Sequence, residues 1–253
     1  SLLLKAGDAR GSEGSLGLAP RQSPRPERVK SVILMMQNGG PSQMDMFDPK
    51  PVLQKLSGKK HDVKIETFQP GSEKNELLGS PFRFRKHGEC GMELSEVIPN
   101  IGRIADDLCL VRSMHTEHNN HTEGLIMFMT GRVFQGRPSF GSWVSYGLGT
   151  SNENLPAYVV LRDPAGYNTS GTLTWSSGWL PALYGGTEFS SQGDAVLDLT
   201  PGRPVLPTVQ ARKLALIKQF NRRHQQRYPG DTELESRIQN YELAARMQMA
   251  ATN

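Results

Sequence analysis

Residues 107–132, with the sequence DLCLVRSMHTEHNNHTEGLIMFMTGR, decide the fold that we predict. The stretch opens with the apolar run LCLV at residues 108–111, which is typical of a strand buried on both faces of a parallel sheet. It ends with apolar residues at helical spacing before Gly131, which predicts a helix over residues 122–130. Because open α/β sheets collect their sites at the carboxyl ends of strands, we expect the chemistry between these two elements.

Three histidines occupy that position. His115, His118 and His121 recur every third residue among asparagine and threonine side chains. Neutral imidazoles are common metal ligands and titrate near neutrality, so the cluster favours a polar site. The alternative is structural: Asn120 or Thr122 caps the following helix, and the loop satisfies backbone groups.

A second polar turn follows another apolar run. Residues 32–36 (VILMM) predict a buried strand, which breaks at the sequence QNGGP. Gly39 and Gly40 permit positive φ and let the backbone approach a ligand closely. The polar side chains around this turn are Asn38, Ser42, Gln43, Asp45 and Asp48. An ordinary turn from strand to helix, with Ser42 as N-cap, is the alternative.

Composition limits the class of protein. With 253 residues and 36% hydrophobic content, the chain can bury one sizeable core in one or at most two domains. The net charge of +4 comes without a dense basic stripe interleaved with aromatics, so nucleic acid is not the expected partner. No apolar run is long enough to predict a transmembrane segment. Cys90 and Cys109 are compatible with two buried thiols or with one disulfide.

The order of elements predicts a three-layer α/β fold with a mostly parallel central sheet. Residues 1–30 are rich in Gly, Ser, Pro and Arg and predict a flexible tether before a domain over residues 31–253. The further elements that we expect are an edge strand in residues 81–91, a helix over 94–104 with a kink or a break into two short pieces at Pro99, a short helix capped by Ser139 and a third buried strand over 158–161. Strands and helices thus alternate along the chain.

The last two predicted regions are a long loop and a helical hairpin. Residues 163–207 carry scattered aromatics, which indicate either a functional loop or lid, or cover for a local core. In the C-terminal hairpin, Pro229 and Gly230 form the turn, and Thr232 with Glu235 makes a capping box. The basic residues of the first helix of this hairpin are interpreted as a solvated face.

Three long stretches carry a resemblance to a known family. They are GGPSQMDMFDPKP at 39–51, PFRFRKHGECGMELSEVIPNIGRIADDLCLVRSMHTEHNNHTEGLIMFMTGR at 81–132 and GRPSFGSWVSYGLGTSNENLPAYVVL at 136–161. The chain resembles the bacterial family called domain of unknown function 1501. This resemblance implies the alkaline phosphatase and sulfatase superfamily, whose hydrolases use divalent metals and a nucleophile at a helix N-terminus. Only the N-terminal half is matched, so we expect an incomplete alkaline phosphatase-like domain.

The sequence departs from the superfamily pattern at two positions. The first strand of the superfamily commonly ends in a metal-binding Asp, where this chain has Asn38. Many members place a Thr, Ser or Cys nucleophile ten residues before the glycine of a Thr-Gly pair like Thr130 and Gly131. Here that position is His121, followed by Thr122. This departure leaves three interpretations open. Thr122 replaces the usual nucleophile, the histidines bind a metal, or the scaffold has lost its catalytic activity.

The resemblance therefore yields a set of expected roles. The catalytic residues expected are Thr122, as nucleophile, and His121; the substrate-binding residues are Asn38, Gly39, Gly40, Ser42 and Asn120; and the ligands of a divalent metal are Asn38, Asp45, His118 and His121. The expected substrate is a small-molecule or polysaccharide ester of sulfate or phosphate. Family members often begin with twin-arginine signals, which implies export to the periplasm or cell surface. The rival hypothesis is a non-catalytic binding or assembly protein on the same scaffold.

Overall fold

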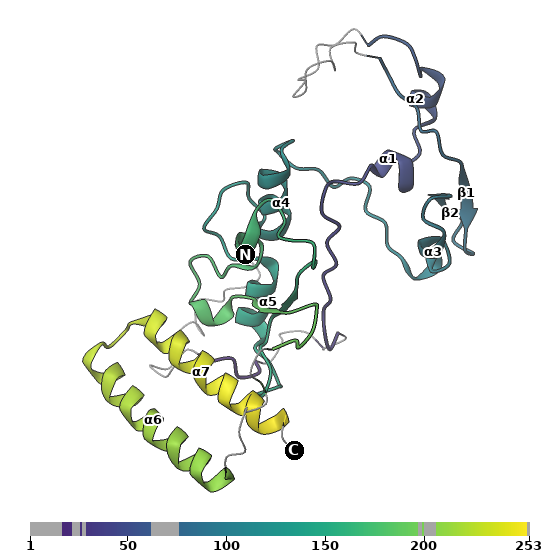
Figure 1. Ribbon diagram of the computed structural model, residues 1–253. Coiled ribbons are helices and arrows are strands. Elements are labelled where there is room, and N and C mark those ends of the chain that lie inside the picture. Colours follow the sequence, from purple (N-terminus) through teal and green to yellow (C-terminus); the bar gives the residue numbers. More distant parts are fainter. Residues whose placement is uncertain are drawn as a thin grey trace. The chain divides into compact units, whose positions relative to one another are not determined.

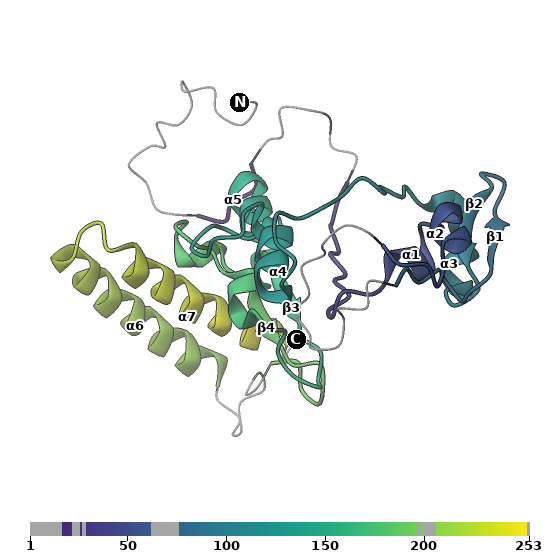
Figure 2. The same ribbon diagram turned by 90° about the horizontal axis from the view of Figure 1, so that it is seen from above.

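The computed structural model describes residues 17–21, 26, 29–61, 76–196, 199 and 206–251. The chain divides into two compact units. The large unit consists of Ser1–Leu34 and Thr116–Asn253, and the small unit consists of Met35–His115. Figures 1 and 2 show the elements of both units, and each unit is described by itself.

The small unit is built around an antiparallel hairpin. Its elements are α1 (Gln43–Met46), α2 (Pro51–Lys55), β1 (Phe84–His87), β2 (Met92–Ser95), α3 (Pro99–Gly102) and the 3-10 helix η2 (Ala105–Asp107). β1 pairs with β2 in a register that sets Phe84 opposite Ser95, so the predicted edge strand is confirmed. The predicted helix over residues 94–104 is wrong in its first half. Leu94 and Ser95 pair with β1, and Pro99, which has no N–H to donate, opens α3.

The carboxylate of Asp106 holds the turn of this hairpin. It accepts hydrogen bonds from the backbone N–H groups of Cys90 at 2.8 Å and Glu89 at 3.0 Å. These bonds stabilise the ionised carboxylate and lower the pKa of Asp106, the bond from Cys90 having the largest effect. The side chain therefore connects η2 to the turn between β1 and β2.

The large unit is mostly helical. Its elements are α4 (His121–Thr130), α5 (Phe140–Leu148), β3 (Val159–Leu161), the 3-10 helices η3 (Gly171–Trp175) and η4 (Ala182–Tyr184), β4 (Thr187–Phe189), α6 (Pro207–Arg227) and α7 (Thr232–Ala251). β3 and β4 are paired in parallel, which confirms a strand at the third predicted place. Its predicted burial is wrong, because Leu161 is 71% exposed. The class is therefore mixed α/β, and the sheets found among the described residues are two pairs of strands.

The apolar core of the large unit forms within the predicted long loop. Leu180, Leu183 and Tyr184 pack together, with Leu18 against them, and Tyr184 is only 1% exposed. The backbone N–H of Leu183 donates to the hydroxyl of the buried Ser236 at 3.2 Å, which ties this core to α7. The aromatic and apolar side chains of this loop thus cover a local core, which was one of the two predicted roles of the loop.

Residues 17–21 lie against this core and α5. The guanidinium of Arg21 donates to the carbonyl of Tyr146 and, at 3.3 Å, to the hydroxyl of Tyr184. The N–H of Thr150 donates to the carbonyl of Leu18 at 2.8 Å. This short part of the range predicted as a tether is therefore bound to the large unit. Residues 1–16, 22–25 and 27–28 of that range lie outside the described residues.

The C-terminal helices confirm the predicted hairpin. Figures 1 and 2 both show α6 and α7 side by side, and Lys218 on α6 lies 3.8 Å from a carboxylate oxygen of Glu242 on α7. The cap differs from the prediction: the side chain of Asp231, not that of Thr232, accepts the N–H of Leu234 at 3.0 Å. Asp231 thus supplies the acceptor that the sequence pattern assigned to its neighbour.

Two of the predicted buried strands are wrong. Residues 32–36 and 108–111 belong to no strand, and their side chains are largely exposed, with Ile33 at 86% and Met35 at 89%. An apolar run favours an extended backbone, but a strand also needs a partner for its N–H and C=O groups. Among the described residues neither run has one.

Cys90 and Cys109 are both free and exposed, so neither the disulfide nor the buried thiols are found. No helix in the described part of the chain combines the length and the hydropathy needed to cross a bilayer.

Two glycines of α5 provide a matched test of this packing. A Cβ at Gly141 would collide with the ring of Tyr158, whereas a Cβ at Gly147 would meet no atom within 4 Å. We therefore predict that Gly141→Ala lowers the free energy of unfolding by about 1–3 kcal/mol. Gly147→Ala should raise it by up to about 1 kcal/mol, because alanine has the higher helix propensity. Urea denaturation measures both, and equal effects of the two changes would contradict this packing.

The Asp106 clamp predicts a pH dependence in the small unit. The pKa of Asp106 is lowered on folding, so its stabilisation is complete above the unfolded value of about 3.9 and is lost as the pH falls through the folded pKa. The amide proton shift of Cys90 should therefore titrate with a midpoint below about 3.9. NMR titration measures this shift. Asp106→Ala should abolish the transition and the control Asp107→Ala should keep it; a transition that survives in Asp106→Ala excludes the clamp.

Candidate functional site

The candidate site lies at the start of α4. Asn120 is the N-cap, and its side-chain oxygen accepts the N–H of Thr122 at 2.9 Å. The buried side chains of Ile126 and Met129 fix the helix, which ends at Gly131 in the left-handed conformation. The predicted helix is confirmed, and of the two proposed caps Asn120 is the one used.

A tight turn holds His118 in front of the helix. The Nδ1 atom of His118 accepts the backbone N–H of Asn120 at 3.1 Å. The backbone N–H of His118 donates to the hydroxyl of Thr116 at 3.0 Å. Because Nδ1 is an acceptor, a neutral His118 carries its proton on Nε2, which is then a donor. The side chains of Asn120, the helix cap, and His118 thus belong to one hydrogen-bond network.

Glu123 adds an unpaired carboxylate oxygen to this turn. Its Oε2 atom is buried and has no hydrogen-bond partner among the described residues. The nearest group is Nδ1 of His118 at 3.7 Å, which is longer than a hydrogen bond. This nitrogen already accepts the N–H of Asn120, so a pair with Glu123 would require protonation of the imidazole and loss of that bond. Buried carboxylate oxygens without partners are costly.

Thr122 occupies the second position of α4 and is half-buried. Its carbonyl accepts the hydroxyl of Ser170 at 3.1 Å, which ties the start of α4 to the turn before η3. Its own hydroxyl makes no hydrogen bond to another described residue. The backbone N–H groups of His121 and Glu123 likewise donate to no described acceptor, and the His121 side chain is exposed. Within the described part of the chain, the helix start therefore has two N–H donors and one hydroxyl without hydrogen-bond partners.

The other half of the predicted site belongs to the small unit. Asn38 and Gly39 form a turn, in which Gly39 has φ 96° and Gly40 has φ 66°. These conformations are the ones that the two glycines were expected to permit. Ser42 is at the N-cap position of α1, but its side chain makes no capping bond. Asp45 is half-buried in α1.

Asp48 joins this turn to the chain that leads into the histidines. Its carboxylate lies 2.6 Å from Nζ of Lys50 and 4.0 Å from Nε of Arg112. Arg112 directly follows the apolar run at residues 108–111. Within the small unit, the long ion pair between Asp48 and Arg112 therefore links the turn after Asn38 to the segment that precedes the histidines.

The structure brings together one part of the predicted set. His118, Asn120, His121 and Thr122 gather in one turn of the large unit, while Asn38, Gly39, Gly40, Ser42 and Asp45 belong to the small unit. The joint pocket of the two halves stays a prediction, as does the metal set. No group of three or more His, Cys, Asp and Glu side chains is placed to hold a metal in the described residues. Glu123 was missed by sequence reasoning, although an acid in a first helical turn is a recognisable signal.

The Asn120 cap yields a direct prediction. Asn120→Ala should lower the free energy of unfolding by about 0.5–2 kcal/mol, because the N–H of Thr122 loses its acceptor. Asn120→Asp keeps an acceptor at the same place and should retain most of the stability. Urea denaturation gives the free energy, and amide exchange at Thr122 reports the local effect. Equal stability of the alanine and aspartate variants would argue against this cap.

The comparisons with known proteins point to one family. The family model described as "Protein of unknown function (DUF1501)" matches residues 29–253, which is most of the chain. No curated protein and no solved structure gives a significant match. Because the match extends over both compact units, the chain belongs to the DUF1501 family.

Proposed function

We propose that this protein is an exported metal-dependent hydrolase of sulfate or phosphate esters that reacts at the start of α4. The observation that carries the proposal is that the Thr122 hydroxyl and the N–H groups of His121 and Glu123, all in the first turn of α4, have no hydrogen-bond partner among the described residues. The N-terminus of a helix favours negative charge through its free N–H groups and its dipole. A nucleophile at this place has donors for the charge that develops on the ester oxygens.

The reaction transfers the sulfuryl or phosphoryl group to Thr122. A bond forms between Oγ1 of Thr122 and sulfur or phosphorus, and the bond from that atom to the alcohol oxygen breaks. His121, as a neutral imidazole, takes the hydroxyl proton and returns it to the departing alcohol. Water then attacks the same sulfur or phosphorus, which releases sulfate or phosphate and restores the threonine. Nε2 of His118 donates a hydrogen bond to an ester oxygen.

The negative charge of Glu123 supports the binding of a divalent metal, which is part of the proposal. The ester is an anion, and it is repelled by the carboxylate unless a cation lies between them. Glu123 would supply one donor, whereas protein metal centres commonly use three or more. His118 could add a second donor only by giving up the N–H of Asn120 at its Nδ1 atom. The described residues of the large unit therefore do not complete a donor set, and no step is assigned to the metal. Asn38 and Asp45 remain the proposed further ligands.

We extend the proposal to the fold and the location. The parallel pairing of β3 with β4 supports an alkaline phosphatase-like domain with a larger, mostly parallel central sheet. Export to the periplasm or cell surface, and a small-molecule or polysaccharide ester as substrate, are proposed from the resemblance.

The alternative function is binding or assembly without catalysis. It is favoured by the fact that Asn120 and His118 are engaged in the cap network and that His121 stands where the superfamily has its nucleophile. This alternative predicts no stoichiometric metal in the purified protein and no effect of Thr122→Ala or His121→Ala on partner binding. Metal analysis and turnover measured on the same sample distinguish the two functions.

Thr122→Ala provides the main test of the hydrolase. We expect it to reduce the hydrolysis of 4-nitrophenyl sulfate or 4-nitrophenyl phosphate, measured with added divalent metals, about a thousandfold or more. His121→Ala should reduce it by about 10²–10⁴-fold.

Helix α6 offers matched controls for both changes. Thr208 occupies the same second helical position as Thr122, and His224 is an exposed histidine. Thr208→Ala and His224→Ala should leave the turnover unchanged. Wild-type turnover in Thr122→Ala, or no turnover in the unaltered protein with any divalent metal, would rule out the proposed reaction.

A further inference from the structure

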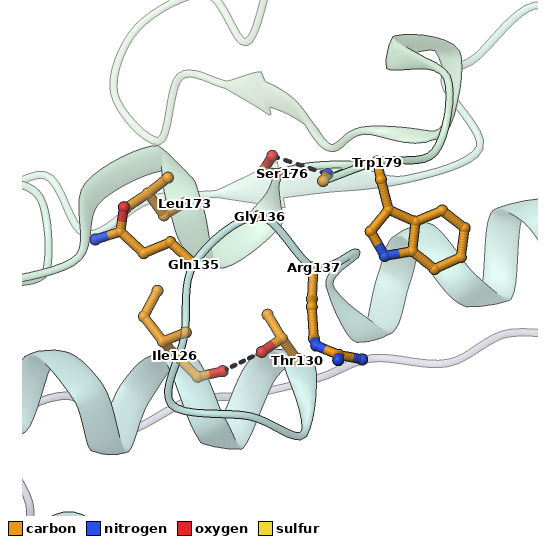
Figure 3. Close-up of a pocket in the computed structure, with 9 residues that line it drawn as sticks. Ile126, Thr130, Gln135, Gly136, Arg137, Leu173, Ser176 and Trp179 are labelled. Carbon is orange, nitrogen blue, oxygen red and sulfur yellow. Dashed lines mark hydrogen bonds between the residues drawn. The ribbon is translucent and has the colours of Figure 1, made fainter.

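A cavity of about 270 Å³ lies at the opposite end of α4 from Thr122. Its walls come from the last turn of α4, the loop that follows it and the segment from η3 onward (Figure 3). It is lined by Ile126, Thr130, Gln135, Gly136, Arg137, Leu173, Ser176, Gly178 and Trp179. Thr122 and Thr130 are eight residues apart, about 12 Å along the helix axis, so this cavity is separate from the proposed reaction site.

The guanidinium of Arg137 gives the wall of this cavity a positive charge. Arg137 is exposed, and its guanidinium makes no ion pair or hydrogen bond with any described residue. Figure 3 shows its side chain running down one side of the cavity, on the side of Trp179. A guanidinium offers five N–H donors in a planar fork that matches carboxylate and sulfate oxygens. The group that it fits best is therefore an oxyanion.

Next to this cation stands an exposed indole. Trp179 is 62% exposed, yet its ring system packs against Trp143 in a T-shaped pair, with ring centroids 5.3 Å apart and planes at 78°. A fixed and exposed indole face is a surface on which an apolar ring can stack. Figure 3 places Leu173 and Gln135 on the other side of the cavity, where the amide of Gln135 can bond hydroxyl groups.

Backbone packing fixes the wall between these side chains. Gly178 has φ +56°, and a Cβ there would collide with the backbone of Arg137 and Pro138, so only glycine permits this approach. The N–H of Ser139 and the hydroxyl of Ser142 both donate to the carbonyl of Ser176, at 3.0 and 3.1 Å. These contacts fix the backbone at Arg137 and at Gly178, the residue before Trp179, before a ligand arrives.

Ser176 keeps a donor for the cavity. Its hydroxyl oxygen accepts the N–H of Gly178 at 3.1 Å, which leaves the hydroxyl proton available. The single hydroxyl proton of Thr130, in contrast, is directed to the carbonyl of Ile126 at 2.8 Å or to that of Arg132 at 3.0 Å, and so is not available to a ligand. The polar groups that remain free in the cavity are thus mainly hydrogen-bond donors around one positive charge.

We propose that this cavity binds one anionic sugar unit, a sulfated or carboxylated pyranose. The sulfate or carboxylate group pairs with Arg137, the apolar face of the ring lies on Trp179, and the ring hydroxyls bond Ser176 and Gln135. The volume of about 270 Å³ lies just below the range of about 300–1,000 Å³ for ligand pockets, which fits a single ring better than a chain. The site holds its ligand whether or not Thr122 is catalytic.

Titration of the protein with small sugars tests the proposal. Galactose 6-sulfate and glucuronate are the anionic probes, galactose is the neutral control, and inorganic sulfate tests the anion alone. Tryptophan fluorescence and calorimetry follow the binding. We expect one or both anionic sugars to bind at least about tenfold more tightly than galactose and inorganic sulfate, because a charged hydrogen bond and stacking act together. The preferred probe distinguishes the sulfate from the carboxylate. Galactose or sulfate binding as tightly as both anionic sugars, or no binding of either anionic sugar, overturns the proposal.

Arg137→Ala should weaken binding of the preferred sugar at least about tenfold, and Trp179→Ala should weaken it similarly. Arg132→Ala is the matched control, since Arg132 is an exposed arginine of the same loop that does not line the cavity. Thermal unfolding of each variant checks the fold, and Trp179→Phe keeps an aromatic face if Trp179→Ala fails to fold. Unchanged affinity in Arg137→Ala, or an equal loss in Arg132→Ala, contradicts the assignment.

Discussion

The large unit depends on how α4 is held at its two ends. Ile126 and Met129 are buried on one side of the helix, while Asn120 caps its first turn and Ser170 bonds the carbonyl of Thr122. These contacts fix the ten residues of α4, His121–Thr130, between the loops on either side of it. Both features for which we propose a role follow from this, because the first turn presents Thr122 and the last turn supplies Ile126 and Thr130 to the cavity. A shift of the helix would alter both places together.

The sequence predicted what short-range rules determine. Helix α4 and its end at Gly131, β3, the edge strand β1 and the α6–α7 hairpin all follow from local spacing and turn residues. The site residues of the histidine loop gather in one turn, because they are neighbours in the chain. The role of Asn120 as cap was one of two stated alternatives, and geometry decided between them.

Long-range pairing was not predictable in the same way. Residues 94–95 joined β2 although their spacing favoured a helix, because β1 offers them a complete set of backbone partners. Residues 32–36 have the composition of a strand, yet no described segment pairs with them. The cavity beside Arg137 was also missed, since its walls come from segments about 40 residues apart that only tertiary structure brings together.

The most direct test of the reaction site is a crystal structure of the protein with vanadate, an analogue of the transferring phosphoryl group. The account predicts vanadium bonded to Oγ1 of Thr122, with vanadate oxygens accepting the N–H groups of His121 and Glu123. Vanadate bound at another place, with the Thr122 hydroxyl vacant at saturating concentration, would contradict it.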